Sequence, residues 1–438
     1  MTQNLAILFS GGKDSNYVTY LAKQTNNNVS CLITLSSKNP NSYMFQSVGN
    51  EIIKVQAKSM NIPLLEYQTE GEKEKELEDL KSALKLAKEK YNIEGVCSGA
   101  IKSAYQSSRI QDICKQLDLF CYNPIWQIDE DEYMDKLLEN NFEISIFGIF
   151  SYPFEKTLLG KTINQNQLNK LKQLRSEFEI SIAGEGGEYE SFILDSPLFS
   201  QKIQIKQFNS KMDSENSGII TNCKVELIKK ENQNKINKVL TNQNNKDKIN
   251  NEKNEEILVI NLNKKENKLY ELEYVKPITQ IIQSQNKTFK VLNYIDLNDK
   301  IITKYNKIIL SGTPLKEFEY LKHLDKFNWI KQKENSNKHI LGICAGCQII
   351  QKIFGANEIN FSEIGLKNPE ILIQDKILNR ESLKEIYTLH SKSFQIPKEF
   401  EIIAKTSIPQ IIKYNNIYGT LFHPEVRNHQ IITNFLNF

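Results

Sequence analysis

Short apolar runs and longer amphipathic stretches alternate along the first hundred residues. Apolar runs with the length of buried strands occur at 7–9, 29–35, 63–67 and 95–99. Stretches with helical periodicity lie between them, at 16–21, 51–60 and 72–91. The last of these gathers on one face Leu77, Leu80, Leu84, Ala87 and Tyr91. Strands that alternate with helices in this way predict an α/β fold with a parallel, doubly wound sheet.

The same pattern restarts in the second part of the chain. Strand-length apolar runs recur there at 257–260, 289–292 and 307–310. The residues before them, 231–254, include nine Asn and five Lys but no aromatic residue and no Gly. Such a segment cannot bury enough apolar area to offset the entropy lost on ordering, so we predict a polar flexible linker. The predicted organisation is two doubly wound α/β domains with mainly parallel sheets, at 1–230 and 255–438.

The overall composition excludes few classes of protein. The chain has 438 residues and 56 Lys and Arg against 53 Asp and Glu, and this net charge of +3 is too balanced to indicate a membrane or a direct nucleic-acid partner. No apolar run is long enough to span a bilayer, and the first residues lack the pattern of a signal peptide. The seven cysteines have no regular spacing, which is typical of reduced thiols. We therefore expect a soluble cytoplasmic protein.

The turn after the first predicted strand is suited to phosphate. It reads Ser10-Gly11-Gly12-Lys13-Asp14-Ser15. Its glycines let the backbone approach a ligand, and the helix that begins there presents unpaired N–H groups to an anion. The spacing is not that of a Walker A loop. The alternative is an ordinary strand-to-helix turn in which Asp14 or Ser15 caps the helix.

These six residues resemble the PP-loop of the ATP pyrophosphatases, which split ATP between the α and β phosphates. The resemblance implies that ATP is bound by Ser10, Gly11, Gly12, Lys13, Asp14 and Ser15. It also implies that Mg²⁺ neutralises the phosphate charge, and Asp14 is the predicted metal ligand. Because the carboxyl ends of parallel strands meet at one edge of a sheet, we expect this loop and the stretch from Gly99 onward to share a site.

Two further strings in the first domain are more specific. Residues 99–109 read Gly-x-Ile-x-Ser-x-Tyr-Gln-x-x-Arg, with Pro-x-Trp at 124–126, and residues 184–191 read Gly-Glu-Gly-Gly-Glu-Tyr-Glu-Ser. Both are similar to the diphthine–ammonia ligase family, PP-loop enzymes of diphthamide synthesis, and the similarity extends over residues 4–230. It implies substrate-binding roles for Tyr105, Gln106, Arg109, Glu185 and Glu188.

Each of these strings has a plainer interpretation. Tyr105, Gln106 and Arg109 would then form a helix surface with a stacked guanidinium. The acidic stretch 185–190 would then be a solvated turn. Its two glycines and three glutamates fit better a flexible loop that approaches Mg²⁺-ATP or a cationic substrate.

In the second domain, Gly-x-Cys344-x-Gly lies between a predicted strand and a predicted helix. This spacing indicates a nucleophile elbow, a sharp turn that exposes the thiol at a helix N-terminus, where the dipole favours the thiolate. All five histidines lie in this half of the chain. The string His423-Pro-Glu425 supplies a base and a carboxylate that orients it, so the three side chains match a nucleophile–base–carboxylate arrangement.

These strings resemble the class I glutamine amidotransferase domain, whose Cys-His-Glu triad hydrolyses glutamine to ammonia. The resemblance covers residues 256–438 and implies that Gly312 belongs to the oxyanion turn and that Gln348 helps to bind glutamine. The alternative is a redox pair of Cys344 and Cys347, which leaves the flanking glycines and the His-Pro-Glu string unexplained. His390 is either a polar loop residue near the site or a satisfied structural histidine.

The two halves together predict a ligase that needs ammonia and a domain that makes it from glutamine. As the resemblance implies, ATP adenylates the diphthine carboxylate on elongation factor 2, pyrophosphate leaves, and ammonia displaces AMP to give diphthamide. Delivery between tethered sites avoids protonation of the ammonia in bulk water. Two alternatives stay open: an ATP-pyrophosphatase amidotransferase that acts on a small molecule or tRNA, and a nucleotide-binding sensor with a degenerate glutaminase-like domain.

Overall fold

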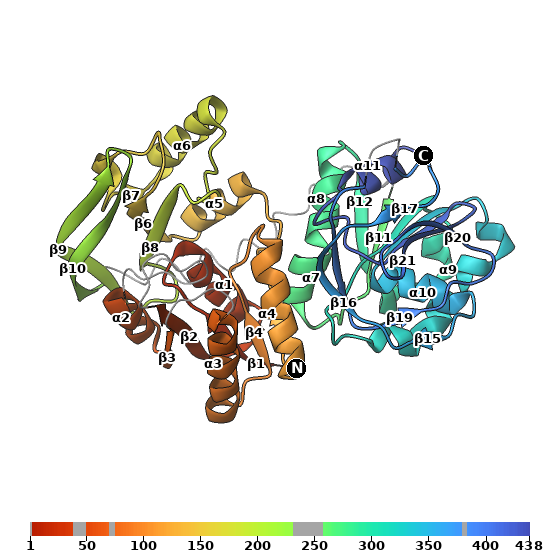
Figure 1. The fold of residues 1–438 in the computed structure, drawn as a ribbon, viewed down its shortest axis with the longest axis horizontal. Coiled ribbons are helices and arrows are strands. Elements are labelled where there is room, and N and C mark those ends of the chain that lie inside the picture. The colour runs from red at the N-terminus through yellow and green to blue at the C-terminus, as the bar shows by residue number, and fades with distance from the viewer. Residues whose placement is uncertain (1, 38–49, 70–74, 231–256, 379–382) are drawn as a thin grey trace. The chain divides into compact units, whose positions relative to one another are not determined.

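A computed structural model of the protein describes residues 2–37, 50–69, 75–230, 257–378 and 383–438. The predicted linker, 231–254, lies outside the described residues. The chain divides into two compact units (Figure 1). The N-terminal unit comprises Thr2–Gly99 and Ile128–Glu252, and the C-terminal unit comprises Ala100–Gln127 and Lys253–Phe438.

The parallel strands of the N-terminal unit run in the order β3-β2-β1-β4. Their bounds are Asn4–Leu8 for β1, Asn28–Ser37 for β2, Leu64–Thr69 for β3 and Gly95–Cys97 for β4. The helices between them are α1 (Lys13–Gln24), α2 (Asn50–Met60) and α3 (Lys75–Tyr91). Helix α3 buries Leu80, Leu84 and Ala87, as its amphipathic pattern predicts. The predicted alternation of strands and helices is confirmed in this part of the chain.

A second sheet of the N-terminal unit is antiparallel and was not predicted. Its order is β7-β6-β10-β9, with β8 paired to β6. The strands are β6 (Glu143–Ile149), β7 (Thr162–Ile163), β8 (Tyr189–Asp195), β9 (Gln201–Ser214) and β10 (Ser217–Lys229). The helices of this part are α5 (Glu130–Glu139) and α6 (Gln165–Phe178). Figure 1 shows β9 and β10 as a long two-stranded ribbon.

The C-terminal unit is built on a sheet with the order β12-β11-β13-β14-β22-β21-β20-β17. The strands from β12 to β22 are parallel, and those from β22 to β17 are antiparallel. In chain order they are β11 (Ile257–Asn261), β12 (Phe289–Asn293), β13 (Lys307–Leu310), β14 (His339–Ile343), β17 (Glu370–Ile371), β20 (Glu401–Lys405), β21 (Pro409–Tyr414) and β22 (Ile417–Thr420).

Helices and short strand pairs complete the C-terminal unit. Its helices are α4 (Ala104–Gln116), α7 (Lys268–Tyr274), α8 (Lys276–Ser284), α9 (Asp299–Ile302), α10 (Ala345–Ile353) and α11 (Gln430–Leu436). Its remaining strands are β5 (Phe120–Tyr122), β15 (Glu358–Ile359), β16 (Glu363–Lys367), β18 (Ile386–His390) and β19 (Ser393–Phe394), where β15 pairs with β19 and β16 with β18.

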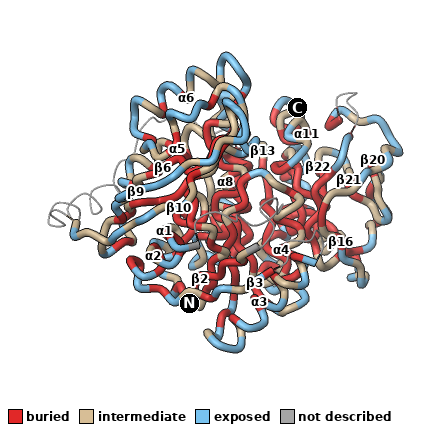
Figure 2. The backbone as a smooth tube through the Cα atoms, turned by 60° about the vertical axis from the view of Figure 1, so that its left-hand side comes forward, coloured by how far each residue is buried: buried red, intermediate tan, exposed pale blue. Residues whose placement is uncertain are grey.

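Both faces of the large sheet are covered by apolar side chains. Ile257 and Val259 of β11 belong to one buried cluster, whereas Leu258 and Ile260 belong to a second. Because successive side chains of a strand point to opposite faces, the two clusters lie on opposite sides of the sheet. Figure 2 shows β22, inside this sheet, as buried, whereas β20, nearer its edge, carries an exposed residue. The predicted doubly wound α/β architecture is thus confirmed for this unit.

The segment Ala100–Gln127 joins the C-terminal unit by its contacts, although it lies within the predicted first domain. The predicted limits of 1–230 and 255–438 divide the chain by composition, whereas the compact units are discontinuous in sequence. Among the described residues, no helix is both long enough and apolar enough to cross a membrane.

Candidate active sites

The loop between β1 and α1 is shaped by two glycines. Gly11 has a φ of +78°, and a Cβ there would lie 2.7 Å from Gln56 Oε1 and from the ring of Phe192. Gly12 is the N-cap of α1, and no side chain caps the helix. Asp14 and Ser15 therefore do not cap the helix, and this part of the plainer interpretation is wrong. The positive dipole end of the helix therefore has no cap from its own N-cap residue.

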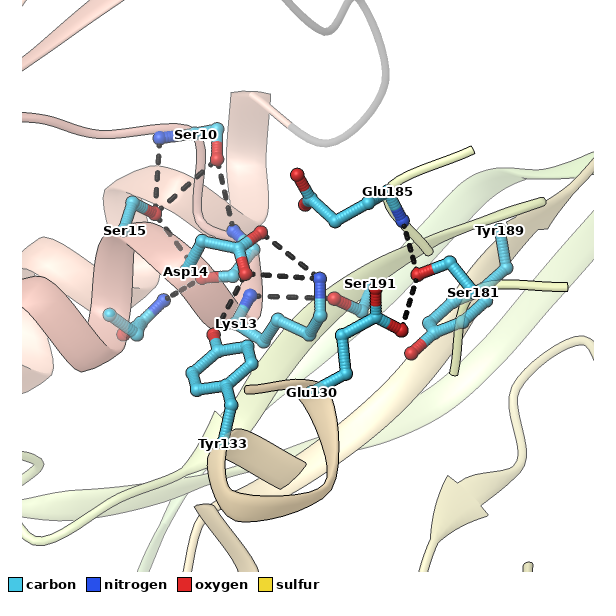
Figure 3. Close-up of polar contacts among 12 residues, drawn as sticks. Ser10, Lys13, Asp14, Ser15, Glu130, Tyr133, Ser181, Glu185, Tyr189 and Ser191 are labelled. Carbon is cyan, nitrogen blue, oxygen red and sulfur yellow. Dashed lines mark hydrogen bonds and ion pairs between the residues drawn. The ribbon is translucent and has the colours of Figure 1, made fainter. Parts of the chain in front are cut away.

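Lys13 and Asp14 form an ion pair at the start of α1 (Figure 3). Lys13 Nζ lies 3.0 Å from Asp14 Oδ1, and the Tyr133 hydroxyl of α5 donates to the same oxygen at 2.7 Å. Burial alone would lower the pKa of Lys13, but Asp14, Tyr189 and Glu185 raise it above its ordinary value. The amine is therefore charged at neutral pH. A fixed positive charge at a helix N-terminus is favourable for a polyphosphate.

One cavity of about 370 Å³ brings this loop together with the 184–191 string. The loop lines it with Ser10, Gly12, Lys13 and Asp14, and the string lines it with Gly184, Glu185, Gly187, Tyr189, Glu190 and Ser191. The Lys13 N–H donates to Ser191 Oγ at 3.4 Å, which ties the two together. The volume is within the range of small-molecule sites. Two strings that are distant in sequence thus form one pocket.

The three glutamates of the string have different surroundings. Glu188 accepts hydrogen bonds from the N–H groups of Ser181 at 2.7 Å and Gly186 at 2.9 Å, so its carboxylate shapes its own loop. Glu185 lines the cavity, and so does Glu190, which the sequence did not single out. Burial raises the pKa of Glu190 to about 7. The geometry favours Glu185 and Glu190 over Glu188 for contact with a ligand.

Asp14 stays the predicted ligand of Mg²⁺. Within the described ranges, no group of three or more His, Cys, Asp or Glu side chains is placed to hold a metal ion. Mg²⁺ is commonly held by one or two carboxylates together with substrate phosphates, so such a group is not required. Asp14, Glu185 and Glu190 line the same cavity and offer the oxygen donors that this ion prefers. The side chains of the cavity therefore fit Mg²⁺ by donor type.

Tyr105, Gln106 and Arg109 lie on α4 in the C-terminal unit. The guanidinium carbon of Arg109 lies 3.4 Å from the centre of the Tyr105 ring, so the stacked guanidinium of the plainer interpretation is present. The backbone N–H of Gln106 donates to Ser103 Oγ, the N-cap of α4, at 3.3 Å. The substrate-binding role of these side chains stays a prediction.

Cys344 occupies a sharp turn between β14 and α10. Its φ is +49° and its ψ is −100°, which is rare for a residue other than glycine. Glycines make the turn possible, because a Cβ on Gly342 would lie 2.5 Å from the carbonyl carbon of Gly346, and a Cβ on Gly346 would lie 2.6 Å from Leu310. This backbone has the geometry of a nucleophile elbow, with strain concentrated at the thiol.

His423 and Glu425 form a buried pair beside this thiol. His423 Nδ1 lies 2.7 Å from Glu425 Oε1, and both residues are about 1% exposed. Burial alone would lower the pKa of His423, but the negative charge of Glu425, the neighbouring Cys344 and the hydrogen bond to Glu425 raise it well above its ordinary value. The imidazole therefore holds a proton beside Cys344. A proton held there suits transfer to a leaving amine.

Gly312 and Gln348 flank the same centre. A Cβ on Gly312 would lie 2.6 Å from His423 Cε1, so the backbone passes close to the ring only because this residue is glycine. Gln348 donates its amide to the Lys392 carbonyl at 2.9 Å and accepts from the Tyr320 hydroxyl. The protein thus fixes the orientation of the Gln348 amide. Tyr320 has no sequence signal of its own, and the oxyanion and glutamine-binding roles stay predictions.

Cys347 does not accompany Cys344. It packs in the apolar cluster on the opposite face of the sheet from Cys344, both thiols are free, and burial raises the pKa of Cys347. This separation argues against a redox pair.

His390 lies in strand β18, not in a loop, and its Nδ1 is 3.3 Å from Ser393 Oγ. Burial and the charge of His423 lower the pKa of His390 to about 3, so the ring is neutral.

Comparison with known families gives matches over most of the chain. The model of the diphthamide synthase N-terminal domain matches residues 3–120, that of the diphthamide synthase C-terminal domain matches 129–228, and that of class-I glutamine amidotransferase matches 269–437. The diphthine–ammonia ligase of Rattus norvegicus is 34% identical over 220 residues, which are 46% of this chain and 82% of that protein. The chain belongs to the diphthine–ammonia ligase family.

A second diphthine–ammonia ligase matches this chain to a similar extent. The Homo sapiens diphthine–ammonia ligase is 34% identical over 218 residues, which are 45% of this chain and 81% of that protein. The resemblance seen in the sequence is confirmed, and the chain is an enzyme of the carbon–nitrogen ligase class. Among solved structures, a glutamine amidotransferase from Thermotoga maritima is 19% identical, covers 42% of this chain and 81% of its own, and has a TM-score of 0.33.

Proposed function

We propose that the protein is a glutamine-dependent ligase that amidates diphthine on elongation factor 2 to diphthamide, with ATP as the energy source. One observation carries this proposal. A single chain of the diphthine–ammonia ligase family holds both a cavity around Lys13, at the N-terminus of α1, and a Cys344 elbow beside a buried His423–Glu425 pair. The first site needs a nitrogen nucleophile, and the second has the groups that release one from glutamine.

At the first site, the chain's own groups would hold the polyphosphate of ATP. Lys13 supplies a charge, and the N-terminus of α1 supplies its dipole. A carboxylate resists nucleophiles, so a diphthine carboxylate oxygen attacks the α-phosphorus and pyrophosphate leaves. Ammonia then attacks the acyl carbon of this acyl-adenylate, and AMP departs with the carboxylate oxygen. Mg²⁺, when bound near Asp14, would neutralise part of the phosphate charge.

At the second site, Cys344 Sγ would attack the amide carbon of glutamine to form a thioester. His423 gives its proton to the departing ammonia, and Glu425 holds the ring by the 2.7 Å contact at Nδ1. Water then hydrolyses the thioester to glutamate and frees the Cys344 thiol.

Two other functions were open from the sequence. A sensor with a degenerate glutaminase-like domain is disfavoured by the intact Cys344, His423 and Glu425. An acceptor that is a small molecule or tRNA is tested by whether diphthine-bearing elongation factor 2 becomes amidated.

The way in which ATP is cut tests the first site. Because the loop has the pattern of a pyrophosphate cradle, incubation with ATP, ammonia and diphthine-bearing elongation factor 2 should release AMP and pyrophosphate in equal amounts. Separation of the nucleotides by chromatography measures this directly. Release of ADP and phosphate in amounts equal to the amide would contradict the PP-loop assignment and, with it, the acyl-adenylate route.

A further inference from the structure

Glu273 of α7 binds the Ala100–Gln127 segment inside the C-terminal unit. Its carboxylate accepts the backbone N–H of Asn123 at 2.8 Å and the Asn123 side-chain amide at 2.9 Å. The Gln111 side-chain amide of α4 lies within 3.4 Å of the same carboxylate. Glu273 is 3% exposed. A carboxylate is buried at a high cost in solvation unless such donors compensate for it, so Glu273 depends on this segment and holds it in place.

Two further pairs of side chains hold the Ala100–Gln127 segment in the C-terminal unit. The Ser107 and Tyr387 hydroxyls lie 3.1 Å apart, and the hydroxyls of Tyr122 and Tyr270 lie 3.0 Å apart. The rings of Tyr122 and Tyr270 stack at 4.9 Å between centroids. The segment is therefore a packed part of the C-terminal unit.

A small cavity lies between this segment and the His423–Glu425 pair. The segment lines it with Ser107 and Trp126, and Glu273, Leu389 and His423 line it from the other sides. Its volume is about 10 Å³, enough for one water-sized molecule. The carbonyl of Leu389 accepts from the Cys344 thiol at 3.5 Å, so a residue that lines the cavity also contacts the nucleophile.

Ammonia has the size of water and carries three N–H donors, so the cavity fits the product that leaves Cys344. Ser107 and Glu273 are among the residues that line the cavity, and their side chains are already hydrogen-bonded to Tyr387 and Asn123. Burial raises the pKa of Glu273 to about 7, and the Asn123 bonds act in the opposite direction. A carboxyl group in this range exists in both protonation states at neutral pH, and in the charged state it accepts hydrogen bonds only.

We propose, on the basis of the function proposed above, that this cavity is where ammonia leaves the glutaminase centre, and that Glu273 is a positioning residue that holds the Ala100–Gln127 segment as the outer wall. The segment follows directly on Gly99, where a Cβ would lie 3.0 Å from Asp14 Cβ. The wall of the ammonia exit and the residues beside the phosphate loop are thus consecutive in the chain. Loss of the wall lets ammonia escape to solvent before it is used.

The test compares amide formed with glutamine consumed. In Glu273→Gln, one acceptor oxygen becomes an amide that faces the Asn123 donors, so we expect the amide formed per glutamate released to fall several-fold. Because the held segment also carries Tyr105, Gln106 and Arg109, the rate of amidation with free ammonia is measured as well, and it should fall less than this ratio. Glu363→Gln is the matched control, because Glu363 is also buried and accepts from Thr406 and Gln410 but does not line the cavity. The control should keep the wild-type ratio.

Asn123→Ala and the double variant complete the measurement. If both residues act through their contact, the two single variants and the double variant should lose coupling to the same extent, since effects that share one contact are not additive. If Glu273→Gln does not fold, Asn123→Ala tests the same contact from the other side. A wild-type ratio in either folded single variant would overturn the role of Glu273. Failure of the wild-type protein to use glutamine at all would instead count against the proposed function.

Discussion

Replacing Cys344 by alanine is expected to abolish amidation supported by glutamine. Without the thiol no thioester forms, and the remaining groups of the centre cannot release ammonia from the amide. The cavity around Lys13 belongs to the other compact unit and stays chemically intact. Free ammonia, supplied at alkaline pH so that enough is unprotonated, should therefore still be converted to the amide at the wild-type rate. The measurement is the yield of amide with each nitrogen source.

Cys347→Ala is the matched control for the thiol. Cys347 packs on the other face of the sheet, so its loss should leave glutamine-supported amidation nearly unchanged. His423→Ala should behave as Cys344→Ala does, because the proton donor for the leaving ammonia is lost. Equal loss from both cysteine variants would favour a redox pair. Retention of glutamine-supported amidation in Cys344→Ala would show that the nitrogen is released elsewhere.

Substitutions in the phosphate loop are expected to slow amidation equally with both nitrogen sources. Lys13→Ala removes a buried charge from the cavity, and Asp14→Asn removes the carboxylate that pairs with it while keeping an acceptor for Tyr133. Loss of one positioned charge at a site of phosphoryl chemistry should lower the rate on the order of 10²-fold or more. The rate of AMP release with saturating ammonia measures this effect.

A lysine that pairs with carboxylates away from the cavity provides the comparison. Lys172 on α6 lies 3.2 Å from Asp131 and 3.1 Å from Asp135 on α5, and these residues are partly exposed. Lys172→Ala should keep the wild-type rate, since ion pairs in contact with solvent contribute little. Glutamine hydrolysis by the Lys13 and Asp14 variants, assayed alone, reports whether their C-terminal unit is intact. Unimpaired AMP release in Lys13→Ala would show that its charge has no part in the chemistry.

Sequence reasoning succeeded where the geometry depends on neighbouring residues. The turn at Gly11 and the elbow at Cys344 are set by glycines within two residues, and the parallel strands follow from local apolar runs. The pairing of His423 with Glu425 is likewise local, because the two are separated by a single proline. Such features depend on which backbone angles each residue type allows, and these can be read from the sequence position by position.

Features that depend on distant contacts were not predictable from one sequence. Nothing near Tyr133 marks it as the partner of Asp14, and nothing in the 184–191 string shows that Glu190, rather than Glu188, lines the cavity. The antiparallel second sheet was missed because its long strands β9 and β10 bury few residues and carry a weak apolar alternation. The grouping of Ala100–Gln127 with the C-terminal unit rests on partners such as Glu273 that lie far along the chain.

The most direct test of the central claim is the mass of elongation factor 2 after reaction. Diphthine-bearing factor is incubated with the protein, ATP and glutamine labelled with heavy nitrogen in its amide group, and the modified peptide is then weighed. The account predicts the mass that results when the carboxylic acid hydroxyl is replaced by an amino group that carries the label, and that product should be missing without ATP. An unchanged peptide mass, while glutamine is hydrolysed and ATP is present, would contradict the proposed acceptor.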